Sequence, residues 1–532
     1  MAWFSDVLQD PLYREGLVNS VILASAVTLL TIVISLPLVL LAETYNFAGK
    51  RIWLALVQVP LILPPFVGAI GLKGMLSRNG GINALLAHFN LVDPANPIDW
   101  LTNPMISCIV LEALYLYPIT FLNLQAAYAN INPALLEASD NLGAGSIRRL
   151  FRVTLPLMRP GVFAGSTIVF IWALTELGTP LMVGFRRVTA VQVFDELQTT
   201  NPQGDTYALV VLLLALSAGL YVCGKLVLGR SPGAMVGRAT VPEPPRRLTT
   251  SGTLLATIPF ALVFLCAATP HIGVLLGSVT KTGMLELAPA KLTLEHHAEL
   301  AKGLVDPGSG AHGLAGLSIV NSLKYSLAAT AIDLVLGFAI AYLIVRRRSR
   351  LSVVLDSLAM LPLAVPGLVM AFGYFALTQG NTPLSFLNPL THSPMPLLVI
   401  AYSVRRLPFI VRSCAAGLEQ TADALEEAAM NLGAGTPRVL RKVTIPLLAP
   451  NFIAGGLLVF SRSMLEVSDS LILAFDRETY PMTKAIWSLA SIPQAGLESA
   501  SALGVWGMLL LVVTIAGASL ALGKRLGALF RI

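Results

Sequence analysis

The sequence predicts an all-α polytopic membrane protein made of two tandem, duplicated helical cores, and three observations support this. First, 55% of the residues are hydrophobic, only 12% are charged, and the mean hydropathy is +0.74. A soluble protein of this composition would expose too much apolar surface, so the bilayer is its solvent. Second, eleven segments have about 20 apolar residues, the length that crosses a hydrocarbon core of about 30 Å. Third, a polar block between these segments occurs twice.

The predicted transmembrane helices number about eleven, and the strand alternation of a membrane β-barrel is absent. With a cytoplasmic C-terminus, an odd number of spans places Met1 outside, so twelve spans with an incomplete start are the alternative. In chain order, the predicted spans are residues 17–42, 54–76, 104–126, 161–184, 206–228, 253–280, 317–345, 353–378, 396–416, 452–475 and 500–522.

The repeated block runs from Glu137 to Gly161 and again from Glu427 to Asn451, and 14 of its 25 positions are identical. Membrane spans resemble one another because all of them must be apolar. Polar loops have no such reason, so the block indicates internal duplication. Each half then has a core of five spans, and the matches continue into these spans in the pairs Asn19/Asn321, Pro64/Pro366, Pro118/Pro408, Phe170/Phe460 and Glu176/Glu466.

The duplication predicts three parts along the chain: a first half at 1–228, a cytoplasmic linker at 229–251 and a second half at 252–532. The second half has one extra span, 253–280, before its core of five. The linker is rich in proline and arginine. Lysine and arginine gather on the side of the repeated loops, which by the positive-inside rule places both loops and the C-terminus in the cytoplasm. The net charge of +7 is therefore an orientation signal, and no nucleic-acid partner is predicted.

Each copy of the block predicts two short helices around a glycine turn. In the first copy, an apolar helix at 134–142 ends at Gly143, and Ser146 caps a basic helix that ends before Pro156. In the second copy, Thr436 is the expected cap, with Pro437 in the first helical turn. Such a loop has an apolar face that it cannot bury alone. Insertion into a groove of a partner explains why the sequence is kept in both copies, and packing against the protein's own spans is the alternative.

These residues resemble a known loop. The pattern Glu-Ala, then Gly, then Leu-Pro or Ile-Pro is similar to the EAA loop of permease subunits in bacterial ATP-binding-cassette importers. The matching residues are Glu137, Ala138, Gly143 and Pro156 in the first copy and Glu427, Ala428, Gly433 and Pro446 in the second. The first copy departs at Ser139, where the motif has a second alanine. The resemblance covers nearly the whole chain as two fused permease halves. It is greatest to the ferric-iron type, with thiamine, phosphonate and polyamine permeases as close relatives.

The resemblance implies a type I importer fold whose loops, 137–161 and 427–451, couple to two copies of a cytoplasmic ATPase. Glu137 and Glu427 would pair with basic groups there, and Gly143 and Gly433 would permit the turn. ATP and Mg would bind the ATPase, because this chain has no GxxxxGK[ST] phosphate loop and is expected to bind no cofactor itself. A substrate-binding protein outside the bacterial inner membrane would deliver the solute.

Charged residues inside predicted spans form the second group of candidate site residues. An ionisable side chain near the bilayer centre costs about 2.5–3.5 kcal/mol, so each needs a partner or water. Arg462 and Glu466 are four residues apart, which predicts a direct pair on one helix face. Glu176 and Glu466, with Arg462 and Arg405, either line the translocation path or lock helix ends. Arg405 lies inside its span or, if that span is shorter, at its cytoplasmic boundary.

The histidines predict no metal site. They fall in predicted external segments or at an outer helix end, with one adjacent pair. A metal relay is one interpretation, and solvated loop residues are the simpler one that their scatter favours. The six are His88, His271, His296, His297, His312 and His392.

Three classes of function fit a polytopic protein, and the importer permease explains the most features. It accounts for the paired loops on one side, the two parallel halves and the absent phosphate loop. A secondary transporter usually has inverted repeats. A membrane enzyme needs a catalytic motif such as HExxH or GxSxG, and the sequence has neither.

Overall fold

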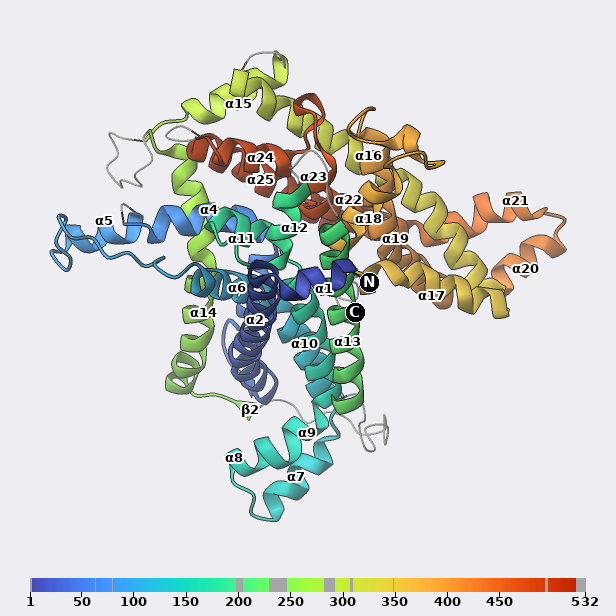
Figure 1. The fold of residues 1–532 in the computed structure, drawn as a ribbon. Coiled ribbons are helices and arrows are strands. Elements are labelled where there is room, and N and C mark those ends of the chain that lie inside the picture. The colour runs from blue at the N-terminus through green and yellow to red at the C-terminus, as the bar shows by residue number, and fades with distance from the viewer. Residues whose placement is uncertain are drawn as a thin grey trace. The chain divides into compact units, whose positions relative to one another are not determined.

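The computed structural model describes residues 2–62, 64–78, 80–197, 204–228, 246–281, 292–306, 310–347, 349–492 and 496–522. The chain divides into two compact units, Met1–Leu292 and Thr293–Ile532. The described residues of both units are overwhelmingly helical (Figure 1). Their one sheet is a two-residue parallel pair between β1 (Tyr45–Asn46) and β2 (Arg246–Arg247). The predicted all-α architecture is confirmed.

The first unit is built around three long helices, α2, α6 and α14. Two of them begin at a capping side chain that is followed directly by a proline. Asp10 accepts a hydrogen bond from the first turn of α2, and Asn103 accepts from the first turn of α6. The elements of this unit are α1 (Ala2–Gln9), α2 (Pro11–Thr44), β1, α3 (Lys50–Leu56), η1 (Val59–Ile62), α4 (Pro65–Leu76), α5 (Gly81–His88), α6 (Pro104–Ala129), α7 (Pro133–Asn141), α8 (Ser146–Arg149), η2 (Leu150–Thr154), α9 (Leu155–Leu157), α10 (Arg159–Leu174), α11 (Gly178–Val183), α12 (Thr189–Leu197), α13 (Gly204–Leu228), β2 and α14 (Thr250–Val279).

The second unit repeats this order from its own long helix, α16, which packs along α19. The elements of this unit are α15 (Glu295–Val305), α16 (Gly310–Arg346), α17 (Arg350–Ala364), α18 (Gly367–Leu377), η4 (Ser385–Leu387), α19 (Met395–Gln420), α20 (Ala424–Asn431), α21 (Thr436–Val439), η5 (Leu440–Thr444), α22 (Ile445–Met464), α23 (Ser468–Leu473), η6 (Arg477–Thr479), α24 (Met482–Ala490) and α25 (Gly496–Leu522).

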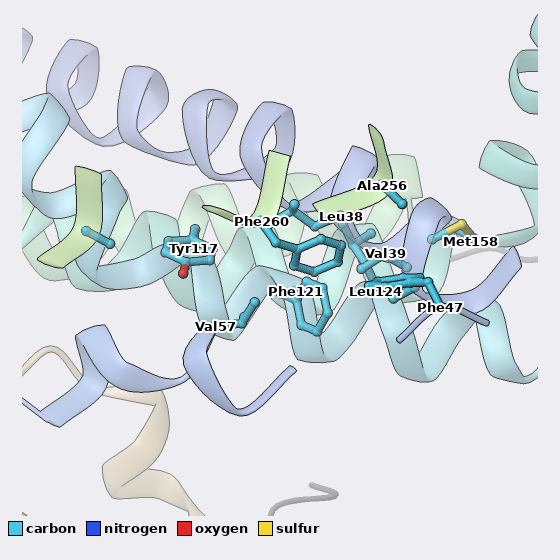
Figure 2. Packing of buried hydrophobic residues seen from close by; sticks show 12 residues of the cluster. Leu38, Val39, Phe47, Val57, Tyr117, Phe121, Leu124, Met158, Ala256 and Phe260 are labelled. Carbon is cyan, nitrogen blue, oxygen red and sulfur yellow. The ribbon is translucent and has the colours of Figure 1, made fainter. Parts of the chain in front are cut away.

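The extra helix of the predicted second half, α14, packs in the first unit. Its residues Ala256 and Phe260 lie against Leu38 of α2 and Phe121 of α6 in one buried cluster (Figure 2). It also packs along α4. The division by packing therefore falls after α14, whereas the duplication divides the sequence before it. The predicted linker, 229–251, lies mostly outside the described residues.

The number of membrane spans is lower than the predicted eleven when whole helices are counted. Six helices among the described residues are long and apolar enough to cross a bilayer, and the count rises to nine if each of three bent pairs is one span. The exact number of eleven is therefore not confirmed. Two of the bends fall where prolines interrupt predicted spans, with angles of 97° before α4 and 103° before α18.

Two further predicted spans, 161–184 and 452–475, end earlier than the sequence suggested. The helix α10 ends at Leu174 and resumes as α11, and α22 ends at Met464 and resumes as α23. Each gap contains one glutamate of the duplicated pair, Glu176 or Glu466. A polar side chain that hydrogen-bonds to nearby backbone offers the chain an alternative to a continuous helix.

Candidate functional sites: the repeated loops and the buried charges

The two repeated loops have the same backbone at their turn. Gly143 and Gly433 have φ angles of 75° and 85°, a left-handed conformation that glycine adopts without steric cost. The N–H of Ala144 bonds to the carbonyl of Ser139 at 3.0 Å, and Ala434 bonds to Ala429 at 3.0 Å in the same way. These bonds close the helix ends as expected for a glycine after a helix. The predicted glycine turn is confirmed in both copies.

The predicted cap of the second helix is wrong in each loop. Gly145 and Gly435 occupy the cap position with extended backbone and no side-chain bond, so Ser146 and Thr436 are the first helical residues. The helix also continues past the expected stop, because a π-helical turn precedes Pro156 and another precedes Pro446. A wider turn gives room for the proline ring, which would otherwise clash with the carbonyl four residues earlier.

The motif residues lie on the exposed side of each loop. Glu137 and Ala138 are exposed on α7, and Glu427 and Ala428 are exposed on α20. The leucine beside each turn is almost fully uncovered, with 88% exposure at Leu142 and 90% at Leu432. Exposed apolar side chains grouped beside polar residues are typical of a protein interaction surface.

The loops differ in how they are anchored. In the second unit, the guanidinium of Arg346 on α16 contacts Asp423 and Glu426 and donates to the carbonyl of Thr421 at 3.1 Å. The carboxylate of Glu426, which is buried, also accepts from Thr444 at 2.9 Å. We name Arg346, Asp423 and Glu426 the α16 anchor. The first loop has Pro133 and Leu136 at the two acidic positions, and its Arg149 instead pairs with Asp140 inside the loop at 2.6 Å.

The buried charges of the second unit meet at the break between α22 and α23. Arg405 and Arg406, near the middle of α19, both contact the carboxylate of Glu466, the Arg405 contact being 3.0 Å long. Asp469, which is fully buried, lies 3.8 Å from Arg405. Gly367 leaves room for this arrangement, since a Cβ there would lie 2.1 Å from the Arg405 guanidinium.

The predicted pair between Arg462 and Glu466 is wrong. The helix α22 ends at Met464, so the two residues do not share the helical spacing on which the prediction depended. Instead, the backbone carbonyl of Arg462 accepts a hydrogen bond from Arg406 at 3.1 Å. The Glu466 carboxylate forms ion pairs with the two arginines of α19. A buried carboxylate needs cationic or N–H partners, and the break in the helix brings it to those of the neighbouring helix.

The first unit places its glutamate at the same break with different neighbours. The Oε1 atom of Glu176 accepts from the backbone N–H of Thr179 at 3.3 Å, in the first turn of α11. Tyr115 and Leu116 stand where the second unit has its two arginines. Glu112 on α6 is buried, and neither of its carboxylate oxygens has a hydrogen-bond partner among the described residues.

Among the buried charges of the second unit that sequence reasoning missed, three are Asp333, Lys484 and Asp469. Asp333 on α16 accepts from Ser403, and Lys484 on α24 donates to the carbonyl of Leu471 at 2.8 Å while lying 4.8 Å from the ring of Trp487. Asp469 is the third. Asp333 and Asp469 sit inside predicted spans, so their charge alone was a signal. Lys484 lies outside every predicted span, and its burial depends on how α24 folds back against α16 and α25.

The histidines do not gather in the described residues. There, no group of three or more histidine, cysteine or acidic side chains is placed to hold a metal ion. His271 lies within α14, in the half nearer its C-terminal end, with Nδ1 at 3.1 Å from the carbonyl oxygen of Ala267. The side chain of His312 lies outside the described residues.

Two helical halves that each expose a matching loop define a membrane protein that presents the same surface twice. Residues 35–230 and 333–527 match the family of binding-protein-dependent transport system inner membrane components. These two ranges cover most of the chain, so the protein belongs to this family of permeases. The expected family, that of type I importer permeases, and the expected duplication are both confirmed.

Two curated relatives named for ferric transport resemble the chain over most of its length. It is 28% identical to the putative ferric transport system permease protein FbpB 1 of Haemophilus influenzae over 466 residues, which are 86% of this chain and 69% of the relative. It is 26% identical to the ferric transport system permease protein FbpB of Actinobacillus pleuropneumoniae, over 94% of this chain and 69% of the relative. The spermidine/putrescine permease protein PotB of Escherichia coli is 30% identical over only 31% of this chain and 60% of its own length.

Proposed function

We propose that the chain is the fused permease of an ATP-driven importer for ferric iron. Its membership of the permease family supports the transport role. The substrate assignment depends on similarity to ferric transport permeases over 86% and 94% of the chain. Relatives named for molybdenum and for spermidine or putrescine match 38% or less of the chain. Polyamines are therefore the weaker alternative substrates, with thiamine and phosphonate.

The observation that carries the proposal is the pair of loops with one geometry and one exposed face. Glu137 and Glu427 would each pair with a basic group on one of two copies of a cytoplasmic ATPase. Leu142 and Leu432 would fill apolar pockets there, because near-complete exposure of a leucine costs free energy that a docked partner recovers. ATP and Mg would bind that ATPase and no cofactor would bind this chain, which is then not itself an enzyme.

The proposed orientation puts both loops and the C-terminus in the cytoplasm of a bacterium, with the chain crossing the inner membrane. A binding protein on the outer side would deliver the solute. Each loop lies at the end of a helix, α10 or α22, that leads directly to a break containing Glu176 or Glu466. Movement of a docked loop would therefore reach the buried charges along one helix in the second unit and across the 70° bend before α10 in the first.

Two roles remain for those charges. The backbone contact of Glu176 and the paired arginines of Glu466 support a locking role at the helix breaks. Lining the translocation path is the second candidate, and the partial exposure of Arg405 and Arg462 favours it for these two residues. Uptake measurements separate the roles, because the Arg462 side chain makes no hydrogen bond or ion pair with the described residues, so Arg462→Met removes none. It should lower transport at unchanged thermal stability only if Arg462 lines the path.

The decisive experiment is reconstitution of the chain with its co-purified ATPase and ferric-binding protein in proteoliposomes. Uptake of ferric iron that needs ATP and the binding protein is the expected result. A matched variant, Leu142→Asp with Leu432→Asp, should lose the ATPase in pull-down while keeping its helical content. Uptake without any ATPase, or an intact complex in that variant, would contradict the proposal. A system that transports only a polyamine would overturn the substrate and keep the mechanism.

A further inference from the structure

The first unit brings cationic residues from two distant segments to one end. The strand β1 directly follows α2, β2 precedes α14, and the two strands pair in parallel with Asn46 opposite Arg247. The N–H of Leu248 donates to the carbonyl of Asn46 at 3.1 Å and continues this contact. Gly49 turns the chain with a φ angle of 79°, and α3 then begins at Lys50. The end of α2 and the start of α14 are therefore joined through backbone.

A cavity of about 550 Å³ lies at this junction, and its lining is part cationic and part apolar. The lining includes Phe47, Lys50, Arg51, Ile52 and Leu54. We name it the α3 cavity. Sites for small molecules commonly have volumes of about 300–1,000 Å³ and combine apolar walls with a few polar groups. A ligand that matches this lining has a negative group and hydrocarbon in one molecule.

The cations around the α3 cavity have donors to spare. The side chains of Arg51 and Arg247 are exposed, and neither forms a hydrogen bond or ion pair with the described residues. Lys50 donates to the carbonyl of Tyr45 at 3.2 Å, which occupies one of the three donors of its ammonium. Arg247 is within reach of the cavity, because its strand partner Asn46 lines it and paired strands lie about 4.8 Å apart. Three cationic side chains can therefore meet one anion.

The surroundings of the α3 cavity have little negative charge. Residues 40–62 and 246–258, which form this end of the unit, include one acid, Glu43. Its Oε1 atom accepts from Gln125 of α6 at 2.7 Å. A zwitterionic head group has an ammonium beside its phosphate, and none of the described residues that line the cavity is a carboxylate that could pair with it. A head group with a net negative charge fits these electrostatics better.

The α3 cavity lies where two apolar helices leave the bilayer. Both α2 and α14 are long and apolar enough to cross a membrane, and the cavity is next to the end of α2 and the strand before α14. Aromatic rings pack at the same level, since the ring of Phe47 lies 5.9 Å from that of Phe260 (Figure 2). The ring of Trp53 lies 6.4 Å from that of Phe260. Tryptophan is enriched at the level of the lipid head groups, so a head group is the anion that this position offers.

We propose that the α3 cavity binds one anionic glycerophospholipid, with its phosphate held by Lys50, Arg51 and Arg247 and its acyl chains beside Ile52 and Leu54. Guanidinium groups match phosphate oxygens with paired N–H donors, and the two arginines supply them. A signal that only orients the chain needs cations on this side of the membrane. It does not need two distant segments paired beside a partly apolar cavity. The bound lipid fastens the chain before α14 to the end of α2.

Native mass spectrometry of the delipidated full chain tests the proposal. The probes are dioleoyl phosphatidylglycerol, which is negative, and dioleoyl phosphatidylethanolamine, which is neutral overall and has the same acyl chains. We expect the first bound lipid to be phosphatidylglycerol, with an affinity about tenfold or more above that of the other lipid. Replacing two cations, as Arg51→Gln with Arg247→Gln, should lower the affinity for phosphatidylglycerol about tenfold or more, because each cation near anionic lipid contributes about a factor of five.

A matched variant removes the same charge elsewhere in the unit. Arg14→Gln with Arg78→Gln changes two exposed arginines outside the cavity, at the start of α2 and after α4, and should leave the affinity unchanged. All four side chains are exposed, so helical content measured by circular dichroism should stay at the wild-type level. Millimolar inorganic phosphate should not displace the lipid, because it fills only the cationic part of the cavity. Equal binding of the two lipids, equal losses in the two variants, or displacement by inorganic phosphate would each overturn the proposal.

Discussion

The first repeated loop is held by a contact within itself, whereas the second is fastened to a long membrane helix. Arg149 and Asp140 join the two helices of the first loop, and both side chains are partly exposed, at 28% and 41%. In the α16 anchor, the side chains of Arg346 and Glu426 are only 9% and 6% exposed. The exposed face and the glycine turn are alike in both copies. Duplication therefore kept the surface that a partner would recognise and let the attachment to the membrane helices diverge.

The same contrast continues where each loop joins its membrane helix. In the first unit the chain bends by 70° between Ser146–Leu157 and Arg159–Leu174, but in the second one apolar helix runs from Thr436 to Met464. A second loop that is anchored to α16 and continuous with α22 should move as one body with the membrane helices. The first loop should move about its bend.

The largest expected effect comes from removing what the loops share. We expect Glu137→Ala with Glu427→Ala to reduce ATP-driven uptake about tenfold or more, because each lost charged hydrogen bond is worth about 1.5–3 kcal/mol. Both carboxylates are exposed, so helical content and membrane insertion should stay at the wild-type level. Wild-type uptake and substrate-stimulated ATP hydrolysis in the double variant would show that the loops do not couple through these residues. The single variants compare the two loops directly. Uptake should fall more with Glu427→Ala, in the anchored second loop, than with Glu137→Ala.

Breaking the α16 anchor should have the next largest effect. Arg346→Met leaves the buried Glu426 without its cation, a change that costs about 3 kcal/mol of the free energy of unfolding. Thermal unfolding in detergent measures the loss, and hydrogen exchange of α20 reports whether the loop is released. Adding Glu426→Gln should recover most of the stability, because a neutral side chain at position 426 no longer needs a cationic partner. Unchanged exchange in α20 would mean that Arg346 does not hold the loop.

A smaller effect is expected where α10 packs on α6 and α22 packs on α19. In the first unit the smaller residue of the contact is on α10, and in the second unit it is on α19. A Cβ on Gly161 would lie 2.3 Å from that of Ala127, whereas in the second unit Asn451 occupies this position, faces Gly417 and donates to the carbonyl of Ser413 at 3.1 Å. Gly161→Asn should therefore destabilise the first unit by about 1–3 kcal/mol through overpacking. Thermal unfolding is again the measurement. Adding Ala127→Gly should rescue it, and failure of the rescue would refute this account of the junction.

The smallest expected effect is loss of the pair inside the first loop. Arg149→Met should change the free energy of unfolding by less than about 1 kcal/mol, because partly exposed ion pairs contribute little in water. Chemical unfolding of this variant beside Arg346→Met tests the asymmetry directly. Equal losses in the two variants would mean that the loops are anchored with similar strength.

The motif residues were predictable because they depend on local chemistry. Gly143 and Gly433 end short helices in any context that needs a left-handed residue, and identity between the copies identified the loops without any structure. The helix breaks were not predictable in this way. An apolar run of about 20 residues predicts a span, but Glu176 and Glu466 interrupt it, and hydropathy gives little weight to one residue.

The sequence by itself determined the membrane environment, the duplication, the helical class and the two exposed loops, because composition and local backbone preference decide each of these. Only the tertiary structure decided which side chains meet. It assigned Glu466 to Arg405 and Arg406 rather than to Arg462, fastened the second loop to Arg346, and packed α14 in the first unit. Partners of a buried charge come from whichever helix lies beside it, and that neighbour is chosen by packing across the whole unit rather than by spacing along one segment.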